Sequence, residues 1–192
     1  GSIPLGAPSD PPYGLSFTVL VDGQTNSETR GDLFVRDTTA PTFETAETEP
    51  TCLWPPNHRY VRFALGENVI VAATDACSPA VRVRIANVVS DQPDAEPGAG
   101  SGNTINDVMF GDTGFCVRAE RSGRAHGGRH YTVTLEATDA WGNVSTRDVV
   151  VEVPHDQRTE CGATSDSRVV SDADAGTSCV FADVPPLPPP RS

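Results

Sequence analysis

Apolar and polar residues alternate with a period of two along most of the stretch from residue 42 to residue 153. Such alternation places one face of each strand in a core and the other face in water. Gly, Asn and Asp residues separate the runs at short spacing, and no segment has the periodicity of an amphipathic helix. The clearest runs are 60–65, 81–86, 131–138 and 149–153. The pattern therefore predicts an all-β fold, an antiparallel β-sandwich of about six or seven strands.

The segments on either side of this stretch differ from it in composition. Residues 1–36 open with a Pro-, Gly- and Ser-rich run and continue with two short predicted strands, Leu15–Val21 and Asp32–Val35, around a polar turn. Residues 156–192 are polar and acidic and end in a Pro-rich run that is typical of a polyproline linker. We therefore expect an N-terminal extension (1–36), a sandwich (37–155) and an irregular, acidic C-terminal tail (156–192).

The charge of the chain limits its partners. Its 192 residues include 14 basic and 26 acidic side chains, which gives a net charge of −12 and favours neither nucleic acid nor an anionic lipid surface as a partner. No apolar stretch approaches the roughly 18 residues that a membrane span requires. The composition therefore predicts a protein that binds no nucleic acid and does not insert directly into a membrane.

Five cysteines point to a compartment. None forms a C-x-x-C pair, so disulfides in an oxidising, extracellular setting are a simpler account than a metal site. A hairpin centred near Gly66 would bring Cys52 close to Cys77, and we predict that disulfide. Cys116 should face away from the core, because Phe115, Val117 and Ala119 alternate with it. Its pairing with Cys161, or a Cys161–Cys179 bond instead, stays open.

One long loop is rich in carboxylates. This acidic loop, residues 90–107, lies between predicted strands and holds no basic residue. Four carboxylates repel one another unless a cation neutralises them, and Ca²⁺ takes about six to eight oxygen ligands. The alternative is a solvated, mobile acidic loop that binds nothing. The sequence thus makes calcium (Ca2+) the candidate cofactor, with the ligands Asp91, Asp94, Glu96, Asn103 and Asp107.

The sequence Ala-Thr-Asp-Ala occurs twice, each time where a predicted strand ends, and it places Asp75 and Asp139 before turns. A carboxylate in that position usually accepts hydrogen bonds from the backbone N–H groups of the next two or three residues. We therefore predict capping roles for Asp75 and Asp139, and keep both as secondary candidates for a cation.

Two further segments carry side chains that could bind something. Trp54, His58 and Tyr60 surround a Pro-Pro pair and form a candidate ligand platform, although a Trp in a chain with only 6% aromatic residues is more often part of a core. The basic segment 118–130 could pair with the acidic loop or with acids of the tail. Motifs of the common enzyme classes, such as G-x-S-x-G, H-E-x-x-H and the P-loop, are missing, so we predict no catalytic residues.

Several of these segments together resemble a known family. The Asp-Thr-Thr-Ala-Pro start at 37–41, the Thr-Asp-Ala-Trp-Gly-Asn turn at 138–143 and the Cys-Leu-Trp-Pro-Pro-Asn-His string at 52–58 look like hyalin-repeat and related bacterial immunoglobulin-like modules. The resemblance covers about residues 37–155. It implies an immunoglobulin-like sandwich and an extracellular, non-catalytic module, often repeated in adhesins or attached to secreted enzymes.

Taken together, the sequence predicts a structural or adhesive module of a secreted or cell-surface bacterial protein, stabilised by calcium. Its partner would be a protein or a glycan at a cell surface. The alternatives are a carbohydrate-binding β-sandwich, for which Trp54, Tyr60 and Trp141 would have to be exposed together, and an accessory domain cut from a secreted enzyme.

Overall fold

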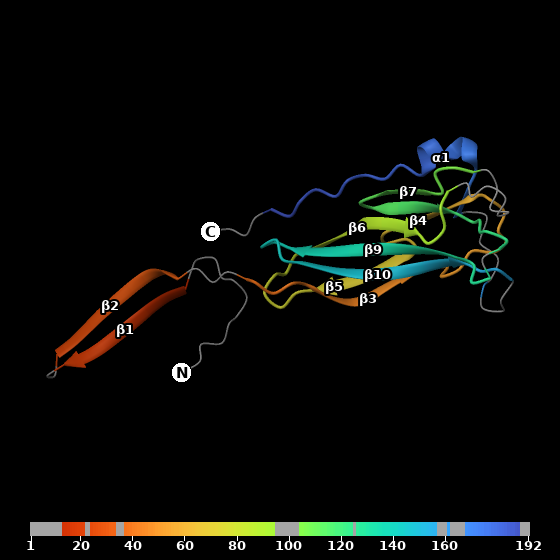
Figure 1. The fold of residues 1–192 in the computed structure, drawn as a ribbon. Coiled ribbons are helices and arrows are strands. Elements are labelled where there is room, and N and C mark those ends of the chain that lie inside the picture. Colours follow the sequence, from red (N-terminus) through yellow and green to blue (C-terminus); the bar gives the residue numbers. More distant parts are fainter. Residues whose placement is uncertain are drawn as a thin grey trace.

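The fold is all-β, as the alternation predicts (Figure 1). The structure is a computed structural model that describes residues 13–21, 24–33, 37–94, 104–124, 126–156, 161 and 168–188. Within these residues three antiparallel sheets build a sandwich-like body, with the strand orders β10-β9-β6, β11-β4-β8-β7 and β3-β5. The strands of this body are β3 (Thr42–Thr48), β4 (Tyr60–Ala64), β5 (Val69–Thr74), β6 (Val81–Ser90), β7 (Val108–Gly111), β8 (Gly114–Arg118), β9 (Arg129–Asp139), β10 (Val144–Val153) and β11 (Val169–Val170).

The core lies between the three sheets, and β9 shows why the strands form where they do. Residues of β9 are alternately buried and half-buried along its whole length, which is the pattern of a strand with one face in the core. Val133 and Leu135 from that buried face pack with Phe63 of β4 and Phe115 of β8. The rings of Phe63 and Phe115 are stacked, with centroids 4.7 Å apart.

The N-terminal extension forms a hairpin of β1 (Tyr13–Val21) and β2 (Gln24–Leu33), drawn apart from the sandwich in Figure 1. Its second strand differs from the prediction, which placed a long polar turn before Asp32. Val21 pairs with Gln24, so only Asp-Gly separates the strands, and Asp-Gly is a strong signal for a two-residue hairpin loop. The polar residues of β2 hid that strand from a search for alternating hydrophobicity.

The C-terminal tail is more ordered than the predicted irregular segment. Its strand β11 pairs with β4, and a short helix α1 (Asp172–Ser178) follows. Ser171 caps this helix by accepting a hydrogen bond from the N–H of Asp174. A helix of 7 residues is too short to show a periodic apolar stripe in the sequence. No helix among the described residues is long and apolar enough to cross a membrane.

The disulfide predicted between Cys52 and Cys77 is wrong. Cys52 is bonded to Cys161, and Cys77 is free. The prediction failed because strands β4 and β5 do not form a hairpin: β4 pairs with β8, whereas β5 pairs with β3. At Gly66, which has a φ of 77°, the chain turns and crosses from one sheet to another.

A second disulfide joins Cys116 of β8 to Cys179 at the end of α1. It corresponds to neither of the two pairings that the sequence left open. The predicted orientation of Cys116 is confirmed, because Phe115 and Val117 lie in the main core while Cys116 packs in a second cluster beneath α1. The tail is thus bonded to the outer face of the sheet that contains β8.

After α1 the tail runs back along the sandwich toward the end at which β6 begins (Figure 1). Phe181 covers the β7–β8 turn so closely that a Cβ atom on Gly114 would lie 2.5 Å from its ring. The Val184 N–H donates to Asp112 Oδ2 at 3.0 Å, and Arg82 Nη1 donates to the Val184 carbonyl at 2.8 Å. Residues 181–184 are therefore an integral part of the body rather than a free linker.

Candidate metal centre

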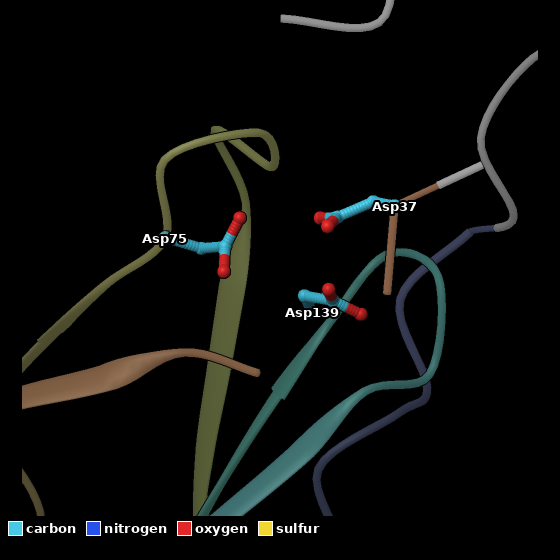
Figure 2. Close-up of side chains that lie close together, drawn as sticks. All are labelled: Asp37, Asp75 and Asp139. Atoms are coloured by element: carbon cyan, nitrogen blue, oxygen red, sulfur yellow. The ribbon is translucent and has the colours of Figure 1, made fainter. Parts of the chain in front are cut away.

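Three carboxylates meet at one end of the sandwich. Asp75 follows β5, Asp139 is the last residue of β9, and Asp37 precedes β3. We call these three residues the acidic triad. One carboxylate oxygen of each lies within 4.8 Å of the others, and Figure 2 shows the three side chains turned toward one another. Asp37 and Asp139 are buried, with 5% and 2% of their surface exposed, and Asp75 is partly buried.

The turns hold one oxygen of each carboxylate in place. Asp75 Oδ1 accepts hydrogen bonds from the N–H groups of Cys77 and Ser78, both at 2.8 Å. Asp139 Oδ1 accepts from the N–H groups of Trp141 at 2.9 Å and Asn143 at 2.8 Å. These bonds confirm the capping roles predicted for Asp75 and Asp139.

Asp37 has the same arrangement, since its Oδ1 accepts from the N–H of Thr39 at 2.9 Å. Its carbonyl oxygen also accepts a hydrogen bond from Asn143 Nδ2 at 3.2 Å. The same Nδ2 donates to Asp139 Oδ2 at 2.8 Å. Asn143 therefore connects the segment before β3 to the β9–β10 turn.

The second carboxylate oxygens of the triad have fewer hydrogen-bond partners. The Oδ2 atoms of Asp37 and Asp75 are buried and have no hydrogen-bond partner in the described part of the chain. Every ion pair among the described residues is made by an acid outside the triad. No Arg or His of the described residues therefore offsets the charge of the triad. Two unit charges about 4 Å apart repel by about 4 kcal/mol at an effective dielectric constant of about 20. The triad therefore carries an electrostatic penalty that a bound cation would remove.

Cys77 lies beside this cluster but is not one of the groups within 4.8 Å of one another. Burial raises the pKa of the Cys77 thiol, and the negative charges of Asp37 and Asp75 raise it further. A protonated thiol is a poor metal ligand, because metals bind the thiolate. Cys77 therefore adds no sulfur ligand, and the donor atoms at this site are all carboxylate oxygens.

The carboxylates of the acidic loop are arranged differently. Asp91 accepts hydrogen bonds from the backbone N–H and from Nδ1 of His130, and Asp94 accepts one from the N–H of Asn106. Asp107 is fully buried, and each of its oxygens accepts a hydrogen bond from an arginine. Glu96 and Asn103 lie outside the described residues. The calcium site predicted in this loop stays a prediction, but Asp107 already has cationic partners.

Those arginines belong to a buried charge network of Arg118, Arg129, Asp107 and Glu120. Arg129 Nη1 lies 2.7 Å from Asp107 Oδ2 and 3.3 Å from Glu120 Oε1, and Arg118 Nε lies 3.2 Å from Asp107 Oδ1. All four residues are at most 4% exposed, and their formal charges sum to zero. Arg118 also reaches Asp172 of α1 at 2.7 Å. The predicted pairing of the basic segment with the acidic loop and with the tail is confirmed.

The candidate ligand platform does not form a shared surface. Tyr60 is 3% exposed, its hydroxyl donates to the Asn106 carbonyl, and the Arg118 guanidinium lies 4.1 Å from its ring centroid. Trp54 is only partly exposed, whereas His58 is exposed. Trp141 follows β9 beside the acidic triad, while Tyr60 pairs with Arg118 near the other end of the sandwich. Trp54, Tyr60 and Trp141 are therefore not exposed together.

The sequence pointed to two members of the triad but missed its arrangement. The repeated Ala-Thr-Asp-Ala segment marks Asp75 and Asp139, and nothing in the sequence alone showed that the two turns meet. Asp37 marks only the start of the predicted sandwich, and no motif links it to a cation. The chain matches no protein-family model, and neither a curated protein nor a solved structure shows significant similarity to it. The resemblance to hyalin-repeat modules stays a prediction.

Proposed function

We propose that this chain is a non-catalytic structural or adhesive module of a secreted or cell-surface protein. The observation that carries the proposal is the buried charge network, in which Arg118, Arg129, Asp107 and Glu120 are paired with one another. Charged groups that are desolvated and mutually neutralised hold segments of the chain in register. Here they join β8 and β9 to the end of the acidic loop and, through Asp172, to the tail.

The two disulfides support an extracellular location. Cys52–Cys161 and Cys116–Cys179 close separations of 109 and 63 residues, and such bonds persist in oxidising compartments. The resemblance of residues 37–155 to hyalin-repeat and immunoglobulin-like modules favours the same location and a role without catalysis. A partner would then be a protein or a glycan at a cell surface.

The geometry around His58 favours this role over a hydrolase. Glu120 Oε2 lies 3.1 Å from His58 Nδ1, and the Thr104 hydroxyl donates to the same carboxylate oxygen. In a nucleophilic relay the hydroxyl would bond to the imidazole, which acts as its base. Here the hydroxyl bonds to the carboxylate instead, so Thr104 is not activated by His58.

The test combines two measurements on the oxidised chain. Peptide mapping without reduction of protein recovered from a secretory host should find both disulfides and a single free thiol. Panels of esterase, glycosidase and peptidase substrates should give no turnover. Turnover that is abolished by His58→Asn or Glu120→Gln would contradict the proposal. Recovery of all five cysteines as thiols from the secreted protein would contradict the extracellular location.

Binding to a glycan array separates the structural or adhesive module from the carbohydrate-binding alternative. The partly exposed Trp54 is the aromatic side chain to vary, because Tyr60 is buried. Sugar binding that Trp54→Ala removes and Trp141→Ala leaves intact would favour a lectin-like site at that end of the sandwich. We expect neither substitution to change the array signal.

A further inference from the structure

We infer that the acidic triad of Asp37, Asp75 and Asp139 binds one Ca²⁺ ion, which fixes the segment before β3 to the β5–β6 and β9–β10 turns. The inference deepens the proposed function and rests on it only for the calcium-rich surroundings of an extracellular protein. It moves the expected ion from the acidic loop to the opposite end of β9.

The main evidence for a bound ligand is that two carboxylate oxygens of the triad are buried without a hydrogen-bond partner among the described residues. Asp37 is 5% exposed, yet its Oδ2 accepts no hydrogen bond from the described residues, and Figure 2 shows its carboxylate turned toward Asp75 and Asp139. The Oδ2 atom of Asp75 is also buried and has no hydrogen-bond partner in the part of the chain that the structure describes. Buried polar atoms in native proteins almost always have a partner, so a pair of orphaned anionic oxygens facing one space indicates a missing cation.

The spacing of the oxygens fits calcium. Ca²⁺ binds oxygen at about 2.3–2.6 Å, so two of its ligands can be at most about 5 Å apart. The three carboxylate oxygens all lie within 4.8 Å of one another, so an ion between them would lie no more than about 2.8 Å from each oxygen, close to the Ca²⁺–oxygen distance. Mg²⁺ binds at about 2.0–2.1 Å and usually keeps several of its waters while contacting one or two carboxylates, so a set of three carboxylates suits Ca²⁺ better.

The chemistry of the donors points the same way. All three ligands are carboxylates, which are hard donors, and the neighbouring Cys77 thiol is outside the cluster. The partly exposed side chain of Asp75 leaves a side on which water could complete the six to eight ligands that Ca²⁺ takes. Zn²⁺ would prefer thiolate or imidazole donors, and the cluster offers neither.

The ion would act on the connection to the N-terminal hairpin. Residue 37 is the first described residue after β2, and its side chain reaches two turns that are 38 and 102 positions further along the chain. Without the ion, Asp37 is bound to the β9–β10 turn by one hydrogen bond from Asn143. With the ion, all three segments would share one charged centre, and the start of the sandwich would be fixed.

The test uses the full chain with both disulfides formed, freed of metal with a chelator and titrated with CaCl₂. Isothermal titration should find one site per chain, with a Kd of about 10⁻⁴–10⁻³ M, the range of extracellular calcium modules. The melting temperature should rise with CaCl₂ and return to its starting value with EDTA. MgCl₂ should bind at least about tenfold more weakly, and equal affinity would overturn the assignment to calcium.

Asp37→Asn is the diagnostic variant, because the amide oxygen keeps the hydrogen bond from Thr39 while one negative charge is removed. It should weaken Ca²⁺ binding by about tenfold or more, and its metal-free melting temperature should equal or exceed that of the wild type. Asp75→Asn also keeps its capping bonds, and it should show the same loss of Ca²⁺ binding and the same metal-free melting temperature. It replaces Asp37→Asn as the diagnostic variant if that variant does not fold. Asp94→Asn in the acidic loop is the matched control and should bind Ca²⁺ as the wild type does.

Three further results would overturn the inference. The wild type could show neither heat of binding nor a change in melting temperature with CaCl₂. Both triad variants could bind Ca²⁺ as the wild type does while melting lower without metal, which would make the carboxylates turn caps only. Asp94→Asn could abolish binding, which would place the ion in the acidic loop. Turnover in the substrate panels would contradict the proposed function and leave this titration unaffected.

Discussion

Replacing Arg129 by Met removes the central cation of the buried charge network. Arg129 has no exposed surface and four hydrogen-bonding partners in the network and its surroundings. Its guanidinium donates to Asp107 at 2.7 Å and to Glu120 at 3.3 Å, to Ser90 Oγ at 2.7 Å and to the Gln92 carbonyl at 3.1 Å. Met fills much of the same volume but leaves a net negative charge buried at this end of the sandwich.

Removing one partner of a buried ion pair typically costs about 3–5 kcal/mol, because the other charge stays buried. Arg118 still contacts Asp107 at 3.2 Å in the variant, so we expect the lower end, a loss of about 3 kcal/mol. Adding Glu120→Gln restores a neutral network. The double variant should therefore be more stable than the sum of the single effects predicts, by about 1–2 kcal/mol.

The assay is equilibrium unfolding in urea at pH 7 without reductant, followed by the fluorescence of Trp54 and Trp141. Arg147→Met on β10 is the matched control, since Arg147 is exposed and makes one bond, to the Phe43 carbonyl at 3.3 Å. It should change the free energy of unfolding by no more than about 0.5 kcal/mol. A loss below about 1 kcal/mol for Arg129→Met, or strict additivity with Glu120→Gln, would refute the reasoning.

Three further predictions concern the tail, the core and the β7–β8 turn. Replacing Cys116 and Cys179 by Ala should lower the free energy of unfolding by about 4 kcal/mol, because the bond closes a separation of 63 residues; alkylation of both thiols in the unreduced native protein would contradict the pairing. Burial raises the pKa of Tyr131 above its unfolded value of about 10. The neutral phenol therefore contributes fully to stability below about pH 10, and above that pH the free energy of unfolding falls by about 1.4 kcal/mol per pH unit. Urea midpoints from pH 8 to 11 should fall less steeply for Tyr131→Phe than for the wild type, and equal slopes would count against a buried phenol. Gly114→Ala should destabilise the protein, because its Cβ would lie 2.4 Å from the Phe63 carbonyl, whereas Gly127→Ala meets nothing within 4 Å; equal urea midpoints for the two variants would contradict this packing.

The parts of the fold that the sequence predicted correctly depend on local patterns. The alternation of β9 follows directly from one face lying in the core. The caps at Asp75 and Asp139 involve N–H groups at most four residues away, so a single turn determines them. The orientation of Cys116 relative to Phe115 follows from the period of a strand.

The parts that it did not predict depend on contacts between distant segments. The runs 58–65 and 68–74 look like the two arms of a hairpin around Gly66. Each strand pairs with another partner instead, which is a tertiary effect, and the register that would have brought Cys52 close to Cys77 therefore does not form. Helix α1 is fixed by its Ser171 cap and by the bond of Cys179 to β8 rather than by a periodic pattern. Asp37 joins the triad only because β3 starts beside the ends of β5 and β9.

The central claim, a calcium ion among Asp37, Asp75 and Asp139, is tested most directly by diffraction from crystals of the chain grown in CaCl₂. We predict one anomalous peak between the three carboxylates, about 2.3–2.6 Å from Oδ2 of Asp37 and of Asp75. A triad without a peak at calcium concentrations well above the measured Kd would contradict the claim, as would a peak found among the carboxylates of the acidic loop instead.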